Sequence, residues 1–521
     1  MKVLFIYPQC PDTTFWSFKT VLWKFLRKKT AFSPLGLLTV AAMLPKIWRK
    51  KLIDLNRDPV LRDADIAWAD LVMISAMIIQ KESAKEAIRR CKVLGKTVVV
   101  GGPLFSGSYK IFTDNYFVLD EAGLIADFPG IDHFVLDEAE ITLPPFLKDL
   151  ERGQAKKIYT AAAKPNLWQS PVPDWSLIKL PDYTTASIQF SRGCPYDCDF
   201  CCVHEMLGRK MRAKSSSQII AELNALYLAG YRGSIFFVDD NFVGLRAAVK
   251  EVLRAVIKWQ EEHNFPFDFL TQASVDMSDD EELLELMRRA GFKKVFLGIE
   301  TTNIEGLRES HKMQNVRRNL KETVKIIHRH GIQVMAGMIV GFDADTPKIF
   351  DEMFKFLQEA GIITAMVNML TILPGTKLWV RMKAEGRLLS DTGGDSVSAE
   401  LNFKPTMGSQ ELSEGYRRLL LKLYQPKHYY RRLRQMMKDL RAGKGKKISF
   451  SDVRAFCQSL WRIGIFSRSN WRYFKLLLRT SIFKRRSLPA AVEAAIIFVH
   501  YNKLSRQVAK KIAKKYSHPQ S

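Results

Sequence analysis

The chain has 521 residues, a mass of 59.7 kDa and a formal net charge of +26 at pH 7. This length predicts two or three domains, and 47% hydrophobic with 26% charged residues excludes a disordered or collagen-like chain. The absence of any run of eighteen uncharged apolar residues argues against a membrane-spanning helix. The chain opens on a short strand-like run rather than on a secretion signal, so we expect a cytoplasmic protein.

Residues 1–155 alternate between strand-like and helical patterns. This alternation predicts a Rossmann-like α/β domain with a parallel sheet covered on both faces. Gly101 and Gly102 stand before Pro103 at the end of a predicted strand, the edge where parallel sheets bind ligands; a tight turn explains them equally well. The expected strands are 3–7, 52–55, 71–76 and 97–100, and the expected helices are 35–48 and 82–94.

Residues 184–395 predict a partial (β/α)6 barrel of the TIM type, after a linker over residues 156–183. Helical patterns here end in glycine shortly before the next apolar run, at Gly230, Gly291, Gly331 and Gly361. The expected strands are 185–190, 235–238, 267–271, 295–299, 334–340 and 366–372, too few to close an eight-stranded barrel. Polar or loop-forming residues follow each strand, and we expect them to share one edge: residues 192–202, Asp239, Asp240, Gln272, Ser274, Glu300, Gly341, Asp343, Pro374 and Gly375.

Four of the seven cysteines lie within nine residues, which indicates metal chemistry in a reducing compartment rather than disulfides. Cys194, Cys198 and Cys201 form a C-x₃-C-x₂-C loop whose thiolates can bind one face of an iron–sulfur cluster and leave one iron open. Zinc is the competing metal, but a structural zinc site needs a fourth ligand. Cys202 and His204 are the nearby candidates for it; we interpret Cys202 as packing and His204 as an ordinary loop residue.

The loop from Arg192 to Cys201, with Phe200 before the third cysteine, resembles the radical S-adenosylmethionine (SAM) superfamily. The resemblance implies that the three cysteines hold a [4Fe–4S] cluster to which SAM binds. One electron from the cluster would cleave SAM and produce a radical that removes hydrogen from an unreactive carbon. The resemblance further implies the following SAM contacts: Phe200, Asp239, Glu300, Gly341, Asp343, Pro374 and Gly375.

A parallel α/β domain before such a barrel resembles the cobalamin-binding class of radical SAM enzymes. The segments 34–38 and 100–103 are similar to the N-terminal domain of that class. The implied cobalamin contacts are Ser75, Gly101, Gly102 and Pro103. No Asp-x-His-x-x-Gly motif is present to supply a histidine to cobalt, so its lower ligand stays unassigned.

Residues 396–521 predict a basic, mostly helical domain. From Glu411 onward there are 27 Lys and Arg against 5 Asp and Glu. Aromatic and basic residues are interleaved around Trp461 and Trp471, a pattern typical of helices on an anionic membrane surface; a helical cap with a solvated charged face explains it equally well. Nucleic-acid binding is the third interpretation. Segments 402–405 and 424–431 resemble the C-terminal domain of a subgroup that includes the hopanoid C-2 methylases.

These resemblances imply a cobalamin-dependent radical SAM methyltransferase that acts on an unactivated carbon of a hydrophobic, lipid-like or other small-molecule substrate. A flavodoxin- or ferredoxin-like protein would donate the electron. The alternatives are a cobalamin-dependent cyclase or oxidative enzyme without methyl transfer, and an RNA-modifying radical SAM enzyme. Only Cys10 and Cys91 precede the loop, too few for the second cluster that a methylthiolating RNA enzyme needs. An iron–sulfur sensor without SAM cleavage is a further, non-enzymatic alternative.

Overall fold

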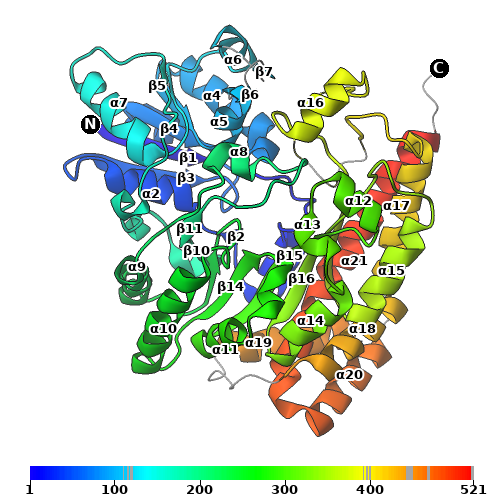
Figure 1. Ribbon diagram of the computed structural model, residues 1–521. Helices are drawn as coiled ribbons and strands as arrows, with labels where there is room; N and C mark the ends of the chain where they lie inside the picture. Colours follow the sequence, from blue (N-terminus) through cyan, green and yellow to red (C-terminus); the bar gives the residue numbers. More distant parts are fainter. Residues whose placement is uncertain are drawn as a thin grey trace. The chain divides into compact units, whose positions relative to one another are not determined.

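Two units, each assembled from separate stretches of the chain, make up the structure (Figure 1). The computed structural model describes all residues except 110, 114, 115, 118–120, 391, 393, 395, 396, 398, 399, 442–449, 466–469 and 518–521. Unit 1 contains residues 1–11, 32–232 and 372–395; unit 2 contains residues 12–31, 233–371 and 396–521.

A six-stranded parallel sheet forms the centre of the first part of unit 1. Its strand order is β3-β1-β4-β5-β8-β9. The four predicted strands are confirmed, whereas β8 and β9 were missed because two or three residues are too few to show an apolar period. The strands are β1 (Lys2–Tyr7), β3 (Arg49–Asp54), β4 (Leu71–Ser75), β5 (Thr97–Gly101), β8 (His133–Val135) and β9 (Ile158–Tyr159).

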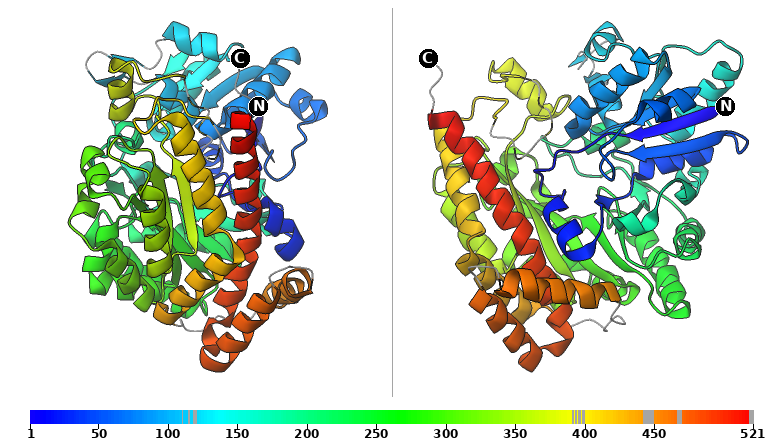
Figure 2. Two further views of the ribbon diagram at one scale, coloured as in Figure 1. Left: turned by 90° about the vertical axis from the view of Figure 1, so that its right-hand side faces the viewer. Right: turned by 180° about the vertical axis from the view of Figure 1, so that it is seen from behind.

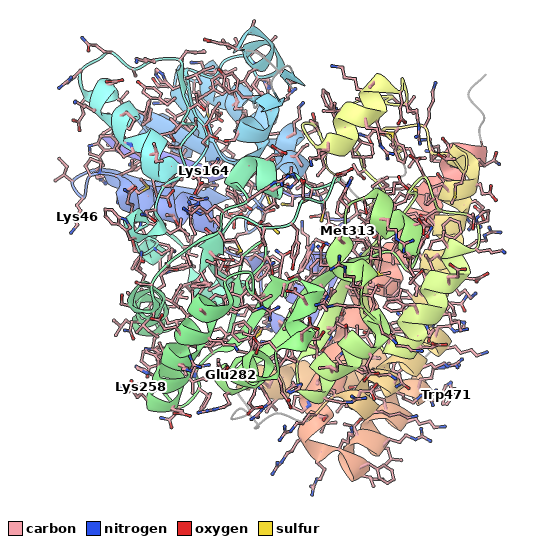
Figure 3. The ribbon with its side chains drawn as sticks, viewed as in Figure 1. Lys46, Lys164, Lys258, Glu282, Met313 and Trp471 are labelled. Atoms are coloured by element: carbon pink, nitrogen blue, oxygen red, sulfur yellow. The ribbon has the colours of Figure 1, made fainter. Side chains whose placement is uncertain are left out.

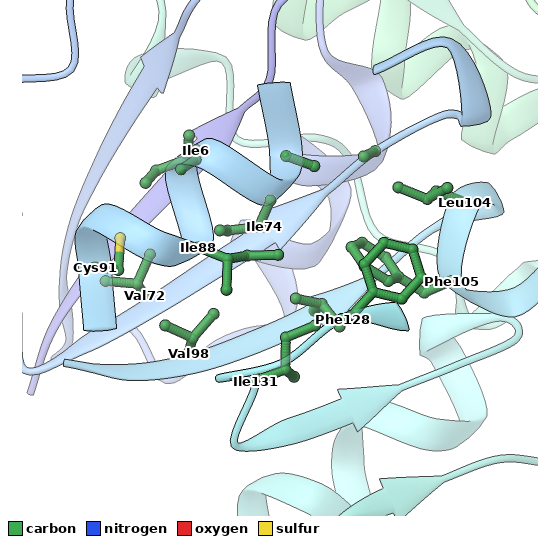
Figure 4. Packing of buried hydrophobic residues seen from close by; sticks show 14 of the residues in the cluster. Ile6, Val72, Ile74, Ile88, Cys91, Val98, Leu104, Phe105, Phe128 and Ile131 are labelled. Atoms are coloured by element: carbon green, nitrogen blue, oxygen red, sulfur yellow. The ribbon is translucent and has the colours of Figure 1, made fainter. Parts of the chain in front are cut away.

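Hydrophobic cores cover both faces of this sheet. Along β1, Leu4 and Ile6 belong to one core while Val3 and Phe5 belong to the other, since successive strand residues point to opposite faces. Cys91 lies in the first core without exposed surface, as a packing thiol (Figure 4). The helices around the sheet are α2 (Leu35–Met43), α3 (Asp63–Trp68), α4 (Lys81–Val93), α5 (Pro103–Tyr109), α6 (Glu121–Asp127) and α7 (Ala139–Glu151).

The helix predicted over 35–48 is shorter than expected. It ends at Met43 because Pro45 has no backbone N–H and restricts the residue before it to an extended conformation. Leu44 accordingly has an extended backbone. The helix predicted over 82–94 is confirmed within one residue at each end.

The second sheet curls into the predicted half-barrel, with the strand order β17-β16-β15-β14-β13-β10-β2. All six predicted strands are present, and the pairs from β13 to β17 are parallel. The three-residue strand β2 was not predicted. The strands are β10 (Tyr183–Ile188), β13 (Ser234–Phe237), β14 (Asp268–Ala273), β15 (Phe292–Glu300), β16 (Gln333–Val340), β17 (Thr364–Met369) and β2 (Thr30–Phe32).

Helices connect these strands and end near the predicted glycines. The left-handed C-cap of α11 is Gly291 and that of α15 is Gly361. The connecting helices are α9 (Ser216–Leu228), α10 (Arg246–Glu262), α11 (Glu281–Ala290), α14 (Leu320–Arg329) and α15 (Ile349–Ala360).

The C-terminal part of unit 2 is helical, as predicted. The long helix α21 runs beside α17 (Figure 2). Residues 12–31 also belong to unit 2: the Phe15 ring packs against Tyr501 of α21, and the Trp16 ring contacts Phe236 and Phe296 of the barrel strands. The helices are α17 (Ser409–Leu423), α18 (Pro426–Asp439), α19 (Phe450–Ser459), the π-turn η7 (Leu460–Ile465), α20 (Asn470–Phe483) and α21 (Leu488–Ser517). Among the described residues, we find no helix with both the length and the apolar character to span a bilayer.

Candidate active site

The three predicted cluster cysteines lie on one loop of unit 1, between β11 (Ser191–Arg192) and α8 (Val203–Leu207). Cys198 is buried, whereas Cys194 and Cys201 are half-buried. The Cys201 N–H donates to the Cys198 carbonyl at 3.0 Å, and the Cys194 N–H donates to the Gly208 carbonyl at 3.2 Å. These backbone bonds fold the loop upon itself and anchor its first cysteine. Phe200 lies half-buried in the same loop.

The donor set of this loop fits a [4Fe–4S] cluster with one open iron, because it offers three soft thiols and no hard oxygen ligand at those positions. Within the described part of the chain, no three His, Cys, Asp or Glu side chains are arranged as a formed metal site. The His204 imidazole is buried and faces Asp197 at 3.3 Å and Glu205 at 3.2 Å. Burial lowers its pKa despite these carboxylates. Cys202 begins α8 as its N-cap residue.

Asp197 of the loop is joined to the segment that follows the last barrel strand. Lys377 Nζ lies 2.6 Å from Asp197 Oδ2, and Arg209 pairs with the same carboxylate. The Leu378 N–H donates to the Asp199 carbonyl at 2.9 Å. Burial opposes ionisation of Asp197, but the two cations hold the pKa of its carboxyl below its usual range. These contacts were not predicted.

The predicted residues Pro374 and Gly375 are brought near the cluster loop by this attachment. They directly precede α16 (Lys377–Ala384), whose N-cap Thr376 accepts from the Trp379 N–H at 3.1 Å. Since Lys377 and Leu378 form the first turn of α16, their two bonds fix the start of this helix against the loop.

A buried ionic network supports the base of the same loop. Arg192 lies 2.8 Å from Glu138 and 2.8 Å from Glu140, and Arg212 lies 2.9 Å from Glu138. Burial alone would raise the pKa of the Glu140 carboxyl. The hydrogen bonds and the charge of Arg192 outweigh burial, so the pKa lies below its usual value. The network ties β11 and β12 (Arg212–Ala213), which flank the loop, to the start of α7.

Replacing Arg192 with alanine should remove the cation that pairs with the buried carboxylates of Glu138 and Glu140. We expect a loss of about 3–5 kcal/mol of stability, because breaking one partner of a buried ion pair strands the other charge. This corresponds to a fall of about 10 °C in Tm, measured by circular dichroism. The matched control is Arg89→Ala, which breaks an exposed pair with Glu86 and should change Tm little. Equal changes in the two variants would contradict a supporting role for the network.

In unit 2, predicted SAM contacts lie at the carboxyl ends of the parallel strands. Asp239 is fully buried just after β13, and Glu300 is the last residue of β15. Glu300 Oε1 lies 2.9 Å from Lys312 Nζ, a partner that was not predicted. Gly298 makes room for this carboxylate, since a Cβ there would lie 2.3 Å from Glu300 Oε1.

The Gly341–Asp343 segment forms a tight loop after β16. The N–H groups of Gly341 and Phe342 donate to Asp345 Oδ2 at 2.9 and 3.1 Å. Burial raises the pKa of the Asp345 carboxyl even though these bonds favour its charged form. Asp343 accepts a hydrogen bond of 2.7 Å from Thr406 Oγ1. Asp345 therefore organises the loop, a role not predicted from the sequence.

Several buried polar atoms at this end of the second sheet have no hydrogen-bond partner among the described residues. Among them are Asn241 Nδ2, Thr302 Oγ1 and Asn368 Oδ1, near the ends of β13, β15 and β17. Buried polar atoms without partners are costly, so they fit a ligand rich in polar groups such as SAM. Sequence reasoning missed all three; a polar residue between apolar neighbours, as in Val367-Asn368-Met369, is the signal that could have found one.

The four predicted cobalamin contacts meet at the carboxyl edge of the six-stranded sheet. Ser75 ends β4 and pairs in register with Gly101 of β5. Gly102 has a φ of +89°, and a Cβ there would lie 2.4 Å from Ser75 Oγ; one at Gly101 would lie 2.7 Å from the Val135 carbonyl oxygen. Pro103 then begins α5. The strand order reverses between β1 and β4, and open α/β sheets bind ligands at such a point. Glycine is therefore required at both positions because the Ser75 hydroxyl and the Val135 carbonyl fill the space of a side chain, and the edge that they form is the one at which open α/β sheets bind ligands.

Cys10, in the loop that follows β1, is a poor metal ligand. Burial, with a contribution from Asp54, raises the pKa of its thiol to about 12. A thiol with this pKa is protonated at neutral pH, whereas metals bind the thiolate.

Comparisons with known proteins identify the family of the chain. Residues 188–357 match the model of the radical SAM superfamily, and residues 376–514 match a domain of unknown function. The chain is 40% identical to the "Uncharacterized methyltransferase sll1242" of Synechocystis sp., over 91% of this chain and 86% of that protein. It is 34% identical to the hopanoid C-2 methylase of Rhodopseudomonas palustris, over 70% of this chain and 66% of that protein.

The fold also resembles that of a solved structure. The radical SAM methyltransferase TsrM from Kitasatospora setae, with cobalamin and a [4Fe–4S] cluster bound, has a TM-score of 0.59 and 16% identity, over 75% of this chain and 79% of that one. This likeness concerns the fold, while the relatives above carry the sequence relationship. The chain belongs to the radical SAM superfamily, within the cobalamin-binding radical SAM methyltransferase family that includes the hopanoid C-2 methylase.

Proposed function

We propose that this chain transfers a methyl group to an unactivated carbon of a hydrophobic, lipid-like substrate. The observation that carries the proposal is a loop of three thiols in the same unit as an open α/β sheet that has a switch point between β1 and β4 and the glycines Gly101 and Gly102 at the same carboxyl edge. Relatives named as methyltransferases, among them a hopanoid methylase, support the reaction and the substrate class.

Each cofactor has its own set of residues in this proposal. When bound, the cluster and SAM supply a radical and cobalamin supplies the methyl group, since such chemistry belongs to the cofactors. The cysteines hold the cluster, and the cation pair on Asp197 keeps their loop in place. The residues proposed to bind SAM are Phe200, Asp239, Glu300, Gly341, Asp343, Pro374 and Gly375, with Lys312 holding the Glu300 carboxylate; those proposed for cobalamin are Ser75, Gly101, Gly102 and Pro103.

We also propose two partners for the enzyme. A flavodoxin- or ferredoxin-like protein supplies the electron, and an anionic membrane surface supplies access to the hydrophobic substrate. The basic C-terminal helices, with 27 Lys and Arg against 5 Asp and Glu from Glu411 onward, support the second partner.

Two measurements test the proposed function. Protein purified without oxygen in the presence of cobalamin should contain about one cobalt and about four iron atoms per chain. Incubation with SAM labelled as CD₃ and a bacterial lipid extract should then place the label on carbon in a lipid product. Iron without cobalt would refute the cobalamin assignment. Cobalt and SAM cleavage without labelled product from any lipid fraction would favour a cobalamin enzyme that transfers no methyl group.

A further inference from the structure

The outward face of α20 is apolar where a surface helix is normally polar. Trp471, Leu478 and Ile482 are 55%, 63% and 61% exposed, and Phe474 is exposed between them. Their spacing along the chain places them on one side of the helix. Figure 3 shows the Trp471 side chain at the outer surface of the helical region. Several large apolar side chains exposed side by side mark an interaction surface.

The opposite side of α20 is packed into unit 2. Tyr473, Leu476 and Leu477 are buried, and the Tyr473 hydroxyl bonds to Ser459 of α19 at 2.6 Å. On the outward side, the edge of the Phe474 ring lies so close to η7 that a Cβ on Gly464 would be 2.9 Å from it. Because the helix is held on its inner side, the apolar stripe cannot turn inward to become core.

Basic side chains flank the stripe. Lys475 and Arg479 are exposed one turn apart beside it, and α20 contains no acidic residue. Trp461 and Ile465, also exposed, extend the apolar surface onto the adjoining η7. We call the exposed residues Trp461, Ile465, Trp471, Phe474, Lys475, Leu478, Arg479 and Ile482 the α20 face.

A cationic hollow of about 190 Å³ adjoins η7 in the same unit. Four cations and an exposed tryptophan contribute to its lining, and no carboxylate does. The lining residues are Trp23, Lys24, Arg27, Arg454, Gln458 and Arg462. Guanidinium and ammonium groups converging on a small hollow suit a phosphate group.

We propose that the α20 face docks on an anionic bilayer, with its apolar side chains among the acyl chains and the cationic hollow holding a lipid phosphate. The α20 face is then the surface that makes the membrane contact of the proposed function, on which this inference rests. Apolar anchors flanked by cations match such a membrane, because both the apolar interior and the anionic headgroups are complementary to them. A second copy of the chain is a poorer match, since two such faces would bring like charges together.

The test is flotation of the full-length protein with vesicles of phosphatidylcholine containing about one quarter phosphatidylglycerol. The triple variant Trp471→Ser, Leu478→Ser, Ile482→Ser should bind about tenfold more weakly than the wild type. Its matched control is Trp168→Ser, Leu228→Ser, Ile47→Ser, which removes the same three side-chain types at exposed sites in unit 1 and should bind like the wild type. Since all six side chains are exposed, Tm should be nearly unchanged.

A charge pair tests the role of the cations that flank the apolar stripe. Lys475→Glu with Arg479→Glu should weaken binding to these vesicles by about tenfold, whereas Lys258→Glu with Lys355→Glu, on α10 and α15, should have little effect. Equal binding by the triple variant and the wild type would overturn the proposal. So would wild-type protein that ignores vesicles but forms dimers, or binds RNA, through these residues.

Membrane binding by the α20 face and the proposed radical SAM chemistry can be measured separately. Cys198→Ala should lose the cluster yet float like the wild type, because flotation needs no SAM chemistry. An α20-face variant should keep iron, cobalt and SAM cleavage in detergent-free solution.

Discussion

Replacing Cys198 with alanine should reduce SAM cleavage by at least about 10³-fold, to the background of the assay. The change removes one of three thiolates, and the remaining two cannot hold three irons of a cubane cluster. Cys198 is also the buried member of the loop, and its carbonyl accepts the Cys201 N–H, a backbone bond that the variant retains. Iron and sulfide per chain after anoxic reconstitution, and 5′-deoxyadenosine released under dithionite, measure the effect. Cys194→Ala and Cys201→Ala should behave in the same way.

The control for this loss is the neighbouring thiol. Cys202→Ala should retain most of the SAM cleavage, because Cys202 begins α8 and lies outside the proposed ligand set. Cys91→Ala, in the core of the first sheet, should lower Tm but leave the cluster content unchanged. Normal iron content and cleavage in any of the three ligand variants would refute the assignment of the loop.

Gly102→Ala should weaken cobalamin binding by about 30-fold or more. A φ of +89° disfavours any side chain, and the new Cβ would lie 2.4 Å from Ser75 Oγ and 3.3 Å from the backbone of Ala76. The backbone strain lowers folding stability, whereas the displacement of this edge from its binding geometry should cost about 2 kcal/mol or more of binding free energy, which converts to that change in affinity. Equilibrium dialysis with hydroxocobalamin, followed by its visible absorbance, gives the dissociation constant.

Gly95→Ala is the matched control for backbone strain alone. Gly95 also has a positive φ, of +65°, but a Cβ there would meet no atom within 4 Å. This variant should lose some stability, about 1 kcal/mol, and bind cobalamin within twofold of the wild type. If Gly102→Ala binds as tightly as Gly95→Ala, the Gly101–Gly102 edge does not contact the cofactor.

Much of the fold could be predicted because its signals are local. The six barrel strands are apolar runs, four of them preceded by helices that end next to a glycine, and the cluster loop places its three thiols within eight residues. The strands of the two large sheets that were missed, β2, β8 and β9, have at most three residues and are too short to show an alternating pattern. The helix predicted over 35–48 was too long for another reason, because one proline ends an otherwise helical pattern.

The sequence by itself determined the fold class, the cluster loop and the order of the strands along the chain, since each depends on residues close in sequence. Only the tertiary structure decided which side chains support them. Arg192 meets Glu138 and Glu140 more than fifty positions away, and Lys377 meets Asp197 at a separation of 180. The outward face of α20 is a further case, because its two apolar sides are alike in sequence until packing buries one of them. Long-range pairing and burial depend on how the strands and helices pack, and no local pattern records that.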